Sequence, residues 1–256
     1  MLRYVLLSYC FASFVLAQSS PAVTVTSTAS ASIGLAPESL ATASGTNLAT
    51  QTAKAPSVPL PTKLGGIQVQ VSDSAFVARS AGLIYVSPTQ INFVVPAGTA
   101  PGAARVLIVG ESPPIVVPVQ IRPVAPGLLS INTLGIAAAT AIRVVIASRM
   151  QAPVPVFQCV DTPGSCRLIP MNLGVDTPIY LSLYGSGIRG RSSLANVVVT
   201  IGRVSVTPLY AGPQPQFPGL DQVVVPLPLS LRGAGQVNVT VKVDGVASNP
   251  VQIEIA

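Results

Sequence analysis

The stretch Pro208–Pro228, PLYAGPQPQFPGLDQVVVPLP, has a counterpart earlier in the chain. Gly82–Pro96 reads GLIYVSPTQINFVVP, with the same succession of an aliphatic–Tyr step, a proline-bearing turn, a Gln, a strand-like run and a closing Pro. The tetrapeptide Pro-Val-Gln-Ile then occurs at 118–121 and again at 250–253, at the same offset from the two stretches. Self-similarity of this kind is the signature of a repeated structural unit. The sequence therefore predicts two tandem copies of one domain.

The composition favours an all-β protein. The 256 residues are 49% hydrophobic but only 5% aromatic and 9% charged, with 25 Pro and 21 Gly, whereas an average chain is about 25% charged. Many Val, Ile and Thr residues between Pro and Gly are typical of short strands separated by turns. Disorder would require low hydrophobicity and high net charge, so this chain is expected to fold.

Several functional classes are disfavoured by residue types. The net charge is +6, but apart from Arg189 and Arg191 the basic residues are scattered, and a nucleic-acid surface needs a basic patch. The chain has no His, which removes the commonest general base and the usual zinc and copper ligands. The eight acidic residues are isolated, whereas a glycosidase needs two facing carboxylates. We therefore expect no nucleic-acid partner, no cofactor, no metal and no enzymatic activity.

One motif has the sequence pattern of a cofactor-binding loop. Gly185–Gly190, GSGIRG, matches the GxGxxG pattern of dinucleotide-binding loops. Such a loop must open a helix and be followed by an acidic residue about 20 positions later. Here Arg191–Leu194 leads into a strand-like run, and the next acidic residue, Asp221, is too distant. The pattern therefore predicts a turn in which glycine adopts a positive φ.

Residues 1–17, MLRYVLLSYCFASFVLA, indicate the compartment. Arg3, an apolar run and a small-residue end are typical of a secretory signal peptide, and the run is too short to span a bilayer. We expect Cys10 to leave with the signal and the mature chain to begin near Gln18, without a membrane span. The predicted localisation is secreted, either extracellular or at the cell surface.

The two remaining cysteines fit that compartment. Cys159 and Cys166 flank a turn-forming hexapeptide between two strand-like runs, so we expect a disulfide across a hairpin. Its loop is short, and the expected stabilisation is about 2 kcal/mol. A thiolate metal site would require more ligands than the chain contains.

The pattern of alternating apolar runs and turns divides the chain. Residues 18–34 are a linker or an edge strand, 35–122 are the first domain, and 123–256 are the second domain with the disulfide hairpin inserted. For residues 128–150 the sequence allows two interpretations, a short helix or a hairpin, and the β-branched run 142–146 favours the hairpin. The expected strands of the first domain are 66–72, 83–86, 90–95, 104–109 and 115–121. Those of the second domain are 154–158, 167–171, 180–184, 195–201, 204–210, 222–225, 236–243 and 251–255.

Longer motifs carry a family resemblance. Leu35–Ser39, Ser44–Leu48, Leu64–Val69 and Tyr85–Pro96 in the first copy, with Tyr180–Gly190, Tyr210–Pro228 and Val243–Val251 in the second, resemble the uncharacterised C-terminal domain of secreted acidobacterial (Solibacter-type) proteins. That family is similar to the IPT/TIG domains of cell-surface proteins. The resemblance implies two tandem immunoglobulin-like antiparallel β-sandwich domains, extracellular placement and no established chemistry. Ala41–Ala43 departs from the family's more apolar strand, which predicts a weak first edge.

The proline-rich loop Ala211–Leu220 is the expected contact site. Proline stiffens it, so little entropy is lost on binding, and rigid loops of sandwich domains commonly carry recognition. Two alternatives stay open: Phe217 plugs the end of the core, and Asp221 hydrogen-bonds its own turn. The candidate binding residues in and beside the loop are Tyr210, Gln214, Gln216, Phe217 and Asp221.

These observations predict a secreted, non-enzymatic structural or adhesive module. It would contact a cell-envelope or extracellular polymer, protein or glycan, through loops and strand edges. A carbohydrate-binding module is the alternative and needs exposed Tyr or Phe side chains in a row on one face; a hydrolase, which needs two acids in one pocket, is disfavoured. The apolar strands also favour self-association through exposed edges, which a monomeric mass by light scattering at high concentration would contradict.

Overall fold

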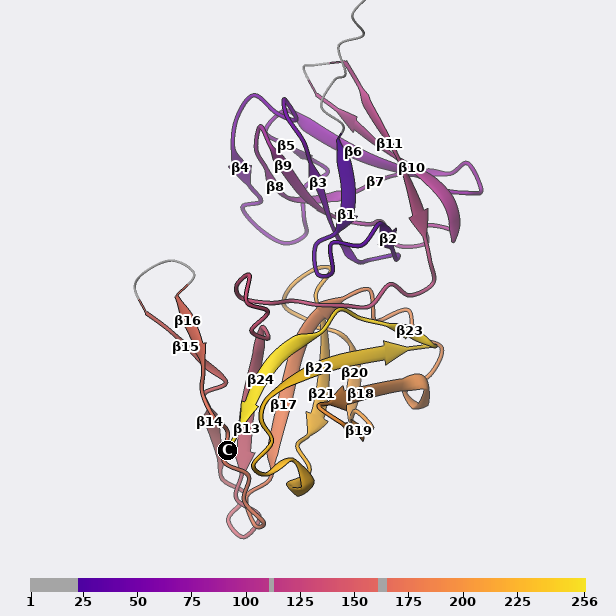
Figure 1. Ribbon diagram of the computed structural model, residues 1–256. Coiled ribbons are helices and arrows are strands. Elements are labelled where there is room, and N and C mark those ends of the chain that lie inside the picture. The colour runs from indigo at the N-terminus through magenta and orange to yellow at the C-terminus, as the bar shows by residue number, and fades with distance from the viewer. Residues whose placement is uncertain (1–22, 111–112, 161–164) are drawn as a thin grey trace, which may run out of the picture.

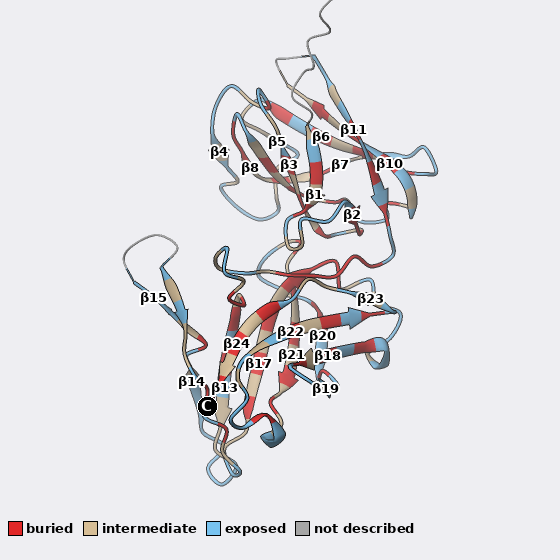
Figure 2. Ribbon diagram, viewed as in Figure 1, coloured by how far each residue is buried: buried red, intermediate tan, exposed pale blue. Residues whose placement is uncertain are grey.

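The computed structural model describes residues 23–110, 113–160 and 165–256, and within these ranges every regular element is a β-strand or a single turn of 3-10 helix. The predicted signal peptide lies outside the described residues. The buried side chains form two separate clusters, one drawn from residues 25–121 and the other from 124–255. Figure 1 shows the corresponding units one above the other, and Figure 2 shows buried residues inside each. The all-β prediction is confirmed.

The first unit is built of two antiparallel-rich sheets that pack around one core. Inward-facing residues such as Phe93 and Leu83 of one sheet meet Val106 and Val71 of the other. The first sheet has the order β1 (Thr24–Ser27), β3 (Leu40–Ser44), β9 (Gln90–Val94), β8 (Gly82–Val86), β4 (Ala53–Lys54). The second has the order β2 (Gly34–Leu35), β11 (Ile115–Ile121), β10 (Gly102–Val109), β6 (Ile67–Ser72), β5 (Lys63–Leu64), with β7 (Ala78–Ser80) also on β6.

The second unit has the same construction. One sheet, the β17 sheet, has the order β14 (Gln151–Val154), β13 (Ala139–Val144), β17 (Ile179–Ser186), β21 (Asp221–Pro226), β20 (Tyr210–Pro213), with β12 (Gly127–Leu128) also on β17. The facing sheet has the order β19 (Val204–Val206), β18 (Val197–Ile201), β22 (Gly235–Val243), with β23 (Val246–Ala247) and β24 (Val251–Ile255) both on β22. Two helical turns complete the unit: η1 (Leu194–Asn196) and η2 (Leu229–Leu231).

The two units share their strand order as well as their sequence motifs. The order β1-β3-β9-β8 in the first unit corresponds to β12-β17-β21-β20 in the second. The repeated tetrapeptide also pairs alike: Gln120 lies opposite Gly34 in a parallel pair, and Gln252 lies opposite Ile136 in a parallel bridge. The sequence repeat therefore marks equivalent strands with equivalent partners.

Local alternation explains the longer strands. In β6 the side chains of Ile67, Val69 and Val71 are buried while those between them face outward, as a half-buried strand requires. The predicted boundaries of β11 and β24 are reproduced. Asp244 and Gly245 join β22 to β23 with φ of 46° and 85°, the positive values that a tight two-residue hairpin turn needs.

The predicted runs 154–158 and 204–210 are wrong as continuous strands. Pro155 separates β14 from β15 (Phe157–Cys159), and Pro208 separates β19 from β20; proline has no N–H to donate to a ladder. The predicted strand 195–201 begins only at Val197, because η1 occupies the residues before it.

Three further predictions are settled by the pairing. Part of 18–34 forms an edge strand, since β1 pairs with β3, while residues 18–22 lie outside the described ranges. The segment 128–150 contains no helix; it holds β13 and the turn that leads into β14, which begins at Gln151 and pairs with β13 as a hairpin. Ala41 and Ala43 do not form a weak edge, because β3 lies between β1 and β9 and both side chains are buried. Small side chains suit that central position.

The disulfide prediction is confirmed. Cys159 and Cys166 are joined, and they close a hairpin of β15 and β16 (Cys166–Leu168) that forms a two-stranded sheet of its own. Figure 1 shows this hairpin standing beside the second unit. The residues between the cysteines include 161–164, which lie outside the described ranges.

A buried carboxylate organises the hairpin between β6 and β7, and it predicts an acid dependence. The amide of Ala100, with those of Val77 and Ala75 and the Arg79 guanidinium, lowers the pKa of Asp73 to about 2, below the ordinary value of about 3.9. A lowered folded-state pKa contributes stability that is complete above the unfolded pKa and is lost as pH falls through the folded one. We expect the stability of the first unit to decline between about pH 4 and pH 2.

This prediction is checked by urea unfolding of the wild type and of Asp73→Asn from pH 2 to pH 7. The variant should be less stable at neutral pH and should show a flatter decline in acid, because it lacks the titrating group. Equal pH slopes in the two proteins would contradict this role of Asp73.

Candidate functional site

The proline-rich loop lies at the junction of the two units. Gly219, with φ of +79°, packs against the first unit so closely that a Cβ there would be 2.7 Å from Leu40 Cδ2 and 3.0 Å from Val94 Cγ2. No side chain could be accommodated without displacing these residues. The loop from the second unit is therefore seated directly on β3 and β9 of the first.

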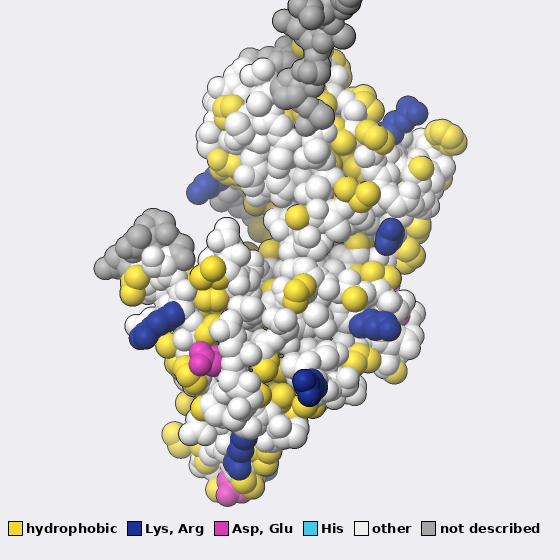
Figure 3. Space-filling model, viewed as in Figure 1, with side chains coloured by type: hydrophobic (Ala, Val, Ile, Leu, Met, Phe, Trp, Pro, Cys, Tyr) yellow, Lys and Arg dark blue, Asp and Glu magenta, His cyan; other side chains and the backbone are white. Residues whose placement is uncertain are grey.

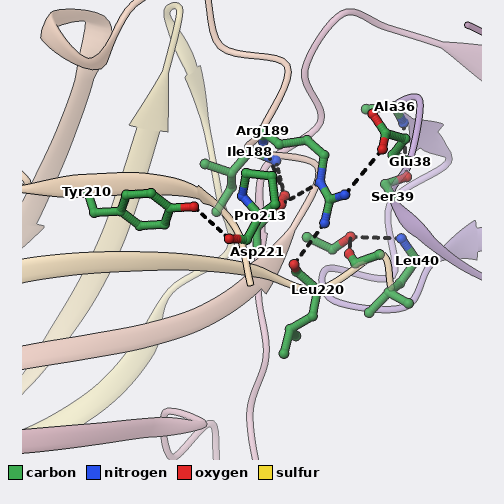
Figure 4. Close-up of polar contacts among 12 residues, drawn as sticks. Ala36, Glu38, Ser39, Leu40, Ile188, Arg189, Tyr210, Pro213, Leu220 and Asp221 are labelled. Carbon is green, nitrogen blue, oxygen red and sulfur yellow. Dashed lines mark hydrogen bonds and ion pairs between the residues drawn. The ribbon is translucent and has the colours of Figure 1, made fainter. Parts of the chain in front are cut away.

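A buried ion pair fixes the base of this loop (Figure 4). Asp221 is fully buried; its Oδ2 accepts the amides of Ile188 at 2.7 Å and Arg189 at 3.2 Å, and its Oδ1 accepts Arg189 Nε at 2.7 Å. Arg189 also donates to the carbonyl of Leu220 at 2.8 Å and reaches Glu38 of the first unit at 3.5 Å. We call Asp221, Arg189 and Glu38 the clasp.

Ser186 adds a second link between the units. This fully buried hydroxyl donates to the carbonyl of Gly219 at 2.9 Å and accepts the amide of Leu40 at 2.7 Å. It thus joins β17, the proline-rich loop and β3 in one hydrogen-bonded chain. Because Ser186 and Asp221 both find partners for their buried oxygens, the junction is specified in geometry and not only by apolar contact.

The GxGxxG segment has a packing role. A Cβ at Gly185, Gly187 or Gly190 would overlap the backbone carbonyls of Gly127, Ala125 or Pro123, respectively. The predicted positive φ is confirmed at Gly187, where it is +75°. The spacing of these glycines therefore lets the connector between the units lie directly on the end of the second sandwich.

A groove of about 640 Å³ opens beside the loop. The loop supplies one wall and β3, β8 and β9, with the segment after β4, supply the other. The lining is mainly apolar, with one lysine, one asparagine, one serine and two aromatic rings; its members include Leu40, Lys54, Ile84, Tyr85, Asn92 and Phe217. Both units are needed to form this surface.

The structure gives the predicted contact residues different positions. Phe217 is 59% exposed on the wall of the groove, so it does not plug the core. The Gln214 side chain accepts the amides of Gln216 and Phe217 and so shapes the loop, while the Gln216 side chain is exposed. Tyr210 is 40% exposed on the edge strand β20.

Asp221 requires a correction. It is buried and saturated, so it cannot meet an external ligand, and its partners are in the loop after β17 and not in its own turn. Glu38 and Arg189, the rest of the clasp, were not predicted from the sequence. The two closely spaced arginines, Arg189 and Arg191, were a sequence signal for an ion pair. No neighbouring residue indicated which acid would pair with Arg189.

The described residues contain no group of three or more His, Cys, Asp or Glu that could hold a metal ion. Nor does any helix in the part of the chain that the structure describes have the length and apolar character to cross a membrane. On the face seen in Figure 3, Lys and Arg side chains are spread singly among uncharged surface.

Comparison with known proteins adds little. No protein-family model and no curated protein matches the chain. Among solved structures, a protein from Bacteroides thetaiotaomicron described as a "putative phosphatase" is similar at 12% identity, over 93% of this chain and 49% of that one, with a TM-score of 0.24. The chain thus spans about half the length of that protein, and a TM-score this low carries no argument about fold or activity.

Proposed function

We propose that this protein is an extracellular, non-enzymatic structural or adhesive module that binds a cell-envelope polymer through the groove at the junction of its units. The groove carries the proposal, because its two walls come from different units that the clasp and Ser186 hold together. We further propose that the units are tandem immunoglobulin-like domains. The shared strand order and the resemblance to secreted acidobacterial domains support this, and the disulfide is compatible with secretion.

The chemistry of the groove favours binding over reaction. Ligand sites are commonly apolar hollows with a few placed polar groups, and here Lys54 and Asn92 accompany the rings of Tyr85 and Phe217. Among the described residues, no acidic side chain lines this groove. A hydrolase would need a general acid or base at the site, whereas a binding module needs only complementary shape and contacts.

The rigidity of the proline-rich loop favours tight binding of a ligand in the groove. A loop that is already ordered loses little conformational entropy when a ligand binds. The loop here is held at Gly219, at Asp221 and by the Gln214 side chain. Phe217 therefore presents its ring from a fixed position, as the aromatic anchors of binding surfaces do.

The test is co-sedimentation of the purified protein with cell-envelope fractions and insoluble polysaccharides. We expect saturable binding to one fraction and a loss of about tenfold in affinity for Phe217→Ala. An aromatic anchor that becomes buried when the ligand binds contributes more than about 1.4 kcal/mol to affinity. The matched control is Phe76→Ala, a phenylalanine that is 92% exposed outside the groove. Absence of binding, or equal loss in both variants, would contradict the proposal.

A further inference from the structure

The two arginines that stand close together in the sequence have opposite environments. The Arg189 guanidinium donates its hydrogen bonds within the clasp and to the carbonyl of Leu220. Arg191 is half-buried beside β20, and its Nε is buried without a hydrogen-bond partner among the described residues. The two Nη groups are not buried in this way, and no hydrogen bond or ion pair of the Arg191 side chain is found among the described residues, so these groups can donate to an acceptor that arrives from outside.

The neighbour of Arg191 is an aromatic ring with an unusual orientation. Tyr210 and Gly212 alternate with the buried Ala211 on β20, so both face away from the core. The hydroxyl of Tyr210 donates to the carbonyl of Pro213 at 2.6 Å, as Figure 4 shows. The ring therefore extends along its own strand, past Gly212, instead of standing upright from the sheet.

Gly212 makes this arrangement possible. A Cβ there would lie 3.1 Å from the Tyr210 hydroxyl and 3.4 Å from Arg191 Nη1, so both side chains occupy the space above the glycine. Gly212 is buried for this reason, although it is on the outward face of an edge strand. An aromatic ring and a guanidinium thus lie side by side at the surface.

Polar side chains continue this surface across the sheet. Gln222, directly opposite Gly212, donates to Ser182 at 3.0 Å, and Tyr184 pairs with Thr140 at 3.1 Å. The span from β20 over β21 to β17 covers about 10 Å at the usual strand spacing. An extended ligand that crosses the strands would meet hydroxyl and amide groups beyond the arginine.

We propose that this outward face of the β17 sheet, centred on Tyr210 and Arg191, binds an acidic polysaccharide. The planar guanidinium matches a sugar carboxylate in a bidentate pair. The Tyr210 ring offers an apolar face against which the C–H face of a pyranose packs. The site is separate from the groove, so it stands whether or not the groove binds a polymer.

The charges around the site favour an anion. Arg191 influences Asp244, whose oxygens already accept the Ser192 hydroxyl at 2.6 Å and amide at 2.8 Å. These bonds, with the Arg191 charge as a smaller cause, lower the pKa of Asp244. Asp244 forms no ion pair with Arg191 among the described residues. The net charge of +6 adds a general attraction for a polyanion.

The experiment is affinity electrophoresis of the purified protein at about 150 mM ionic strength, where non-specific attraction is screened. The probes are polygalacturonate and the same polymer with its carboxylates methyl-esterified. We expect retardation by the acid form alone, and a loss of about tenfold or more in affinity for Arg191→Gln and for Tyr210→Ala, since hydrogen bonds to charged groups and buried aromatic contacts each contribute on this scale.

The matched control is Arg203→Gln, which removes an equal charge from an exposed position elsewhere in the same unit. It should bind like the wild type. Equal loss in Arg203→Gln, equal retardation by the esterified polymer, or no retardation by either polymer would overturn the proposal. Thermal unfolding of each variant shows that the fold is retained. If binding is lost in Arg191→Gln but not in Phe217→Ala, the sheet site stands and the groove does not account for that binding.

Discussion

Replacing Asp221 by Ala should lower the free energy of unfolding of the second unit by about 3–5 kcal/mol, the usual cost of removing one partner from a buried ion pair. The carboxylate is fully buried and accepts hydrogen bonds from two amides and one guanidinium. Without it, Arg189 would remain as a largely buried charge, because its side chain is only 12% exposed. Chemical denaturation followed by circular dichroism measures the effect.

The matched control is Asp176→Ala. That acid is exposed and its side chain makes no hydrogen bond or ion pair in the described part of the chain, so its removal should change stability by no more than about 0.5 kcal/mol. A loss in Asp221→Ala as small as in this control would show that water replaces the carboxylate. The clasp would then be incidental to the junction.

The second large effect is expected for Gly187→Ala. The new Cβ would overlap the carbonyl of Ala125 in the connector between the units. It would also be placed at φ of +75°, where an L-residue costs about 1–2 kcal/mol. Forcing extra volume into a packed contact adds about 1–3 kcal/mol, so the expected loss is about 2–5 kcal/mol. Because the connector must move, the affinity of the groove should also fall.

Gly245→Ala separates the two causes. Gly245 has φ of +85°, but no neighbouring atom lies within 4 Å of the position that a Cβ would occupy, so the variant shows the backbone cost alone, about 1–2 kcal/mol. The difference between the two variants in denaturant unfolding measures the contact with the connector. Identical losses would mean that the connector yields freely, which would contradict a packing role for the GxGxxG glycines.

The glycines and the clasp together hold the junction of the two units, where the groove lies. The connector lies on the second unit at Gly185, Gly187 and Gly190, and the loop from the second unit lies on the first at Gly219. Each contact requires the absence of a side chain. The contact at Gly219 joins the units directly, and with the Ser186 hydrogen bonds and the Arg189–Glu38 ion pair it holds the two walls of the groove against each other.

Much of the fold could be predicted because its causes are local. Alternation along 67–72, the turn at Asp244–Gly245 and the prolines between runs each act over a few residues. They account for β6 and the β22–β23 hairpin, and the predicted bounds of β11 and β24 match at both ends. The disulfide was predictable for the same reason, since Cys159 and Cys166 face each other across one hairpin. Where prolines interrupted a run that was predicted as continuous, the strand ended there.

The candidate sites depend on causes that are not local. Gln214 and Phe217 could be assigned to a contact loop, but the wall that faces Phe217 comes from β3, β8 and β9 of the other unit. Arg191 gave no sign of differing from Arg189 until the loop after β17 was placed against β20.

An all-β chain with a duplicated motif, its hairpins and its disulfide follow from the sequence alone, because alternation, turn residues and spacing act within short segments. The folded arrangement was needed to show that Asp221 is the internal partner of Arg189, that the GxGxxG glycines carry the connector, and that Tyr210 and Arg191 share a surface. The physical reason is that side-chain pairs between loops depend on how the ends of two sandwiches meet, and that arrangement depends on the packing of the whole chain.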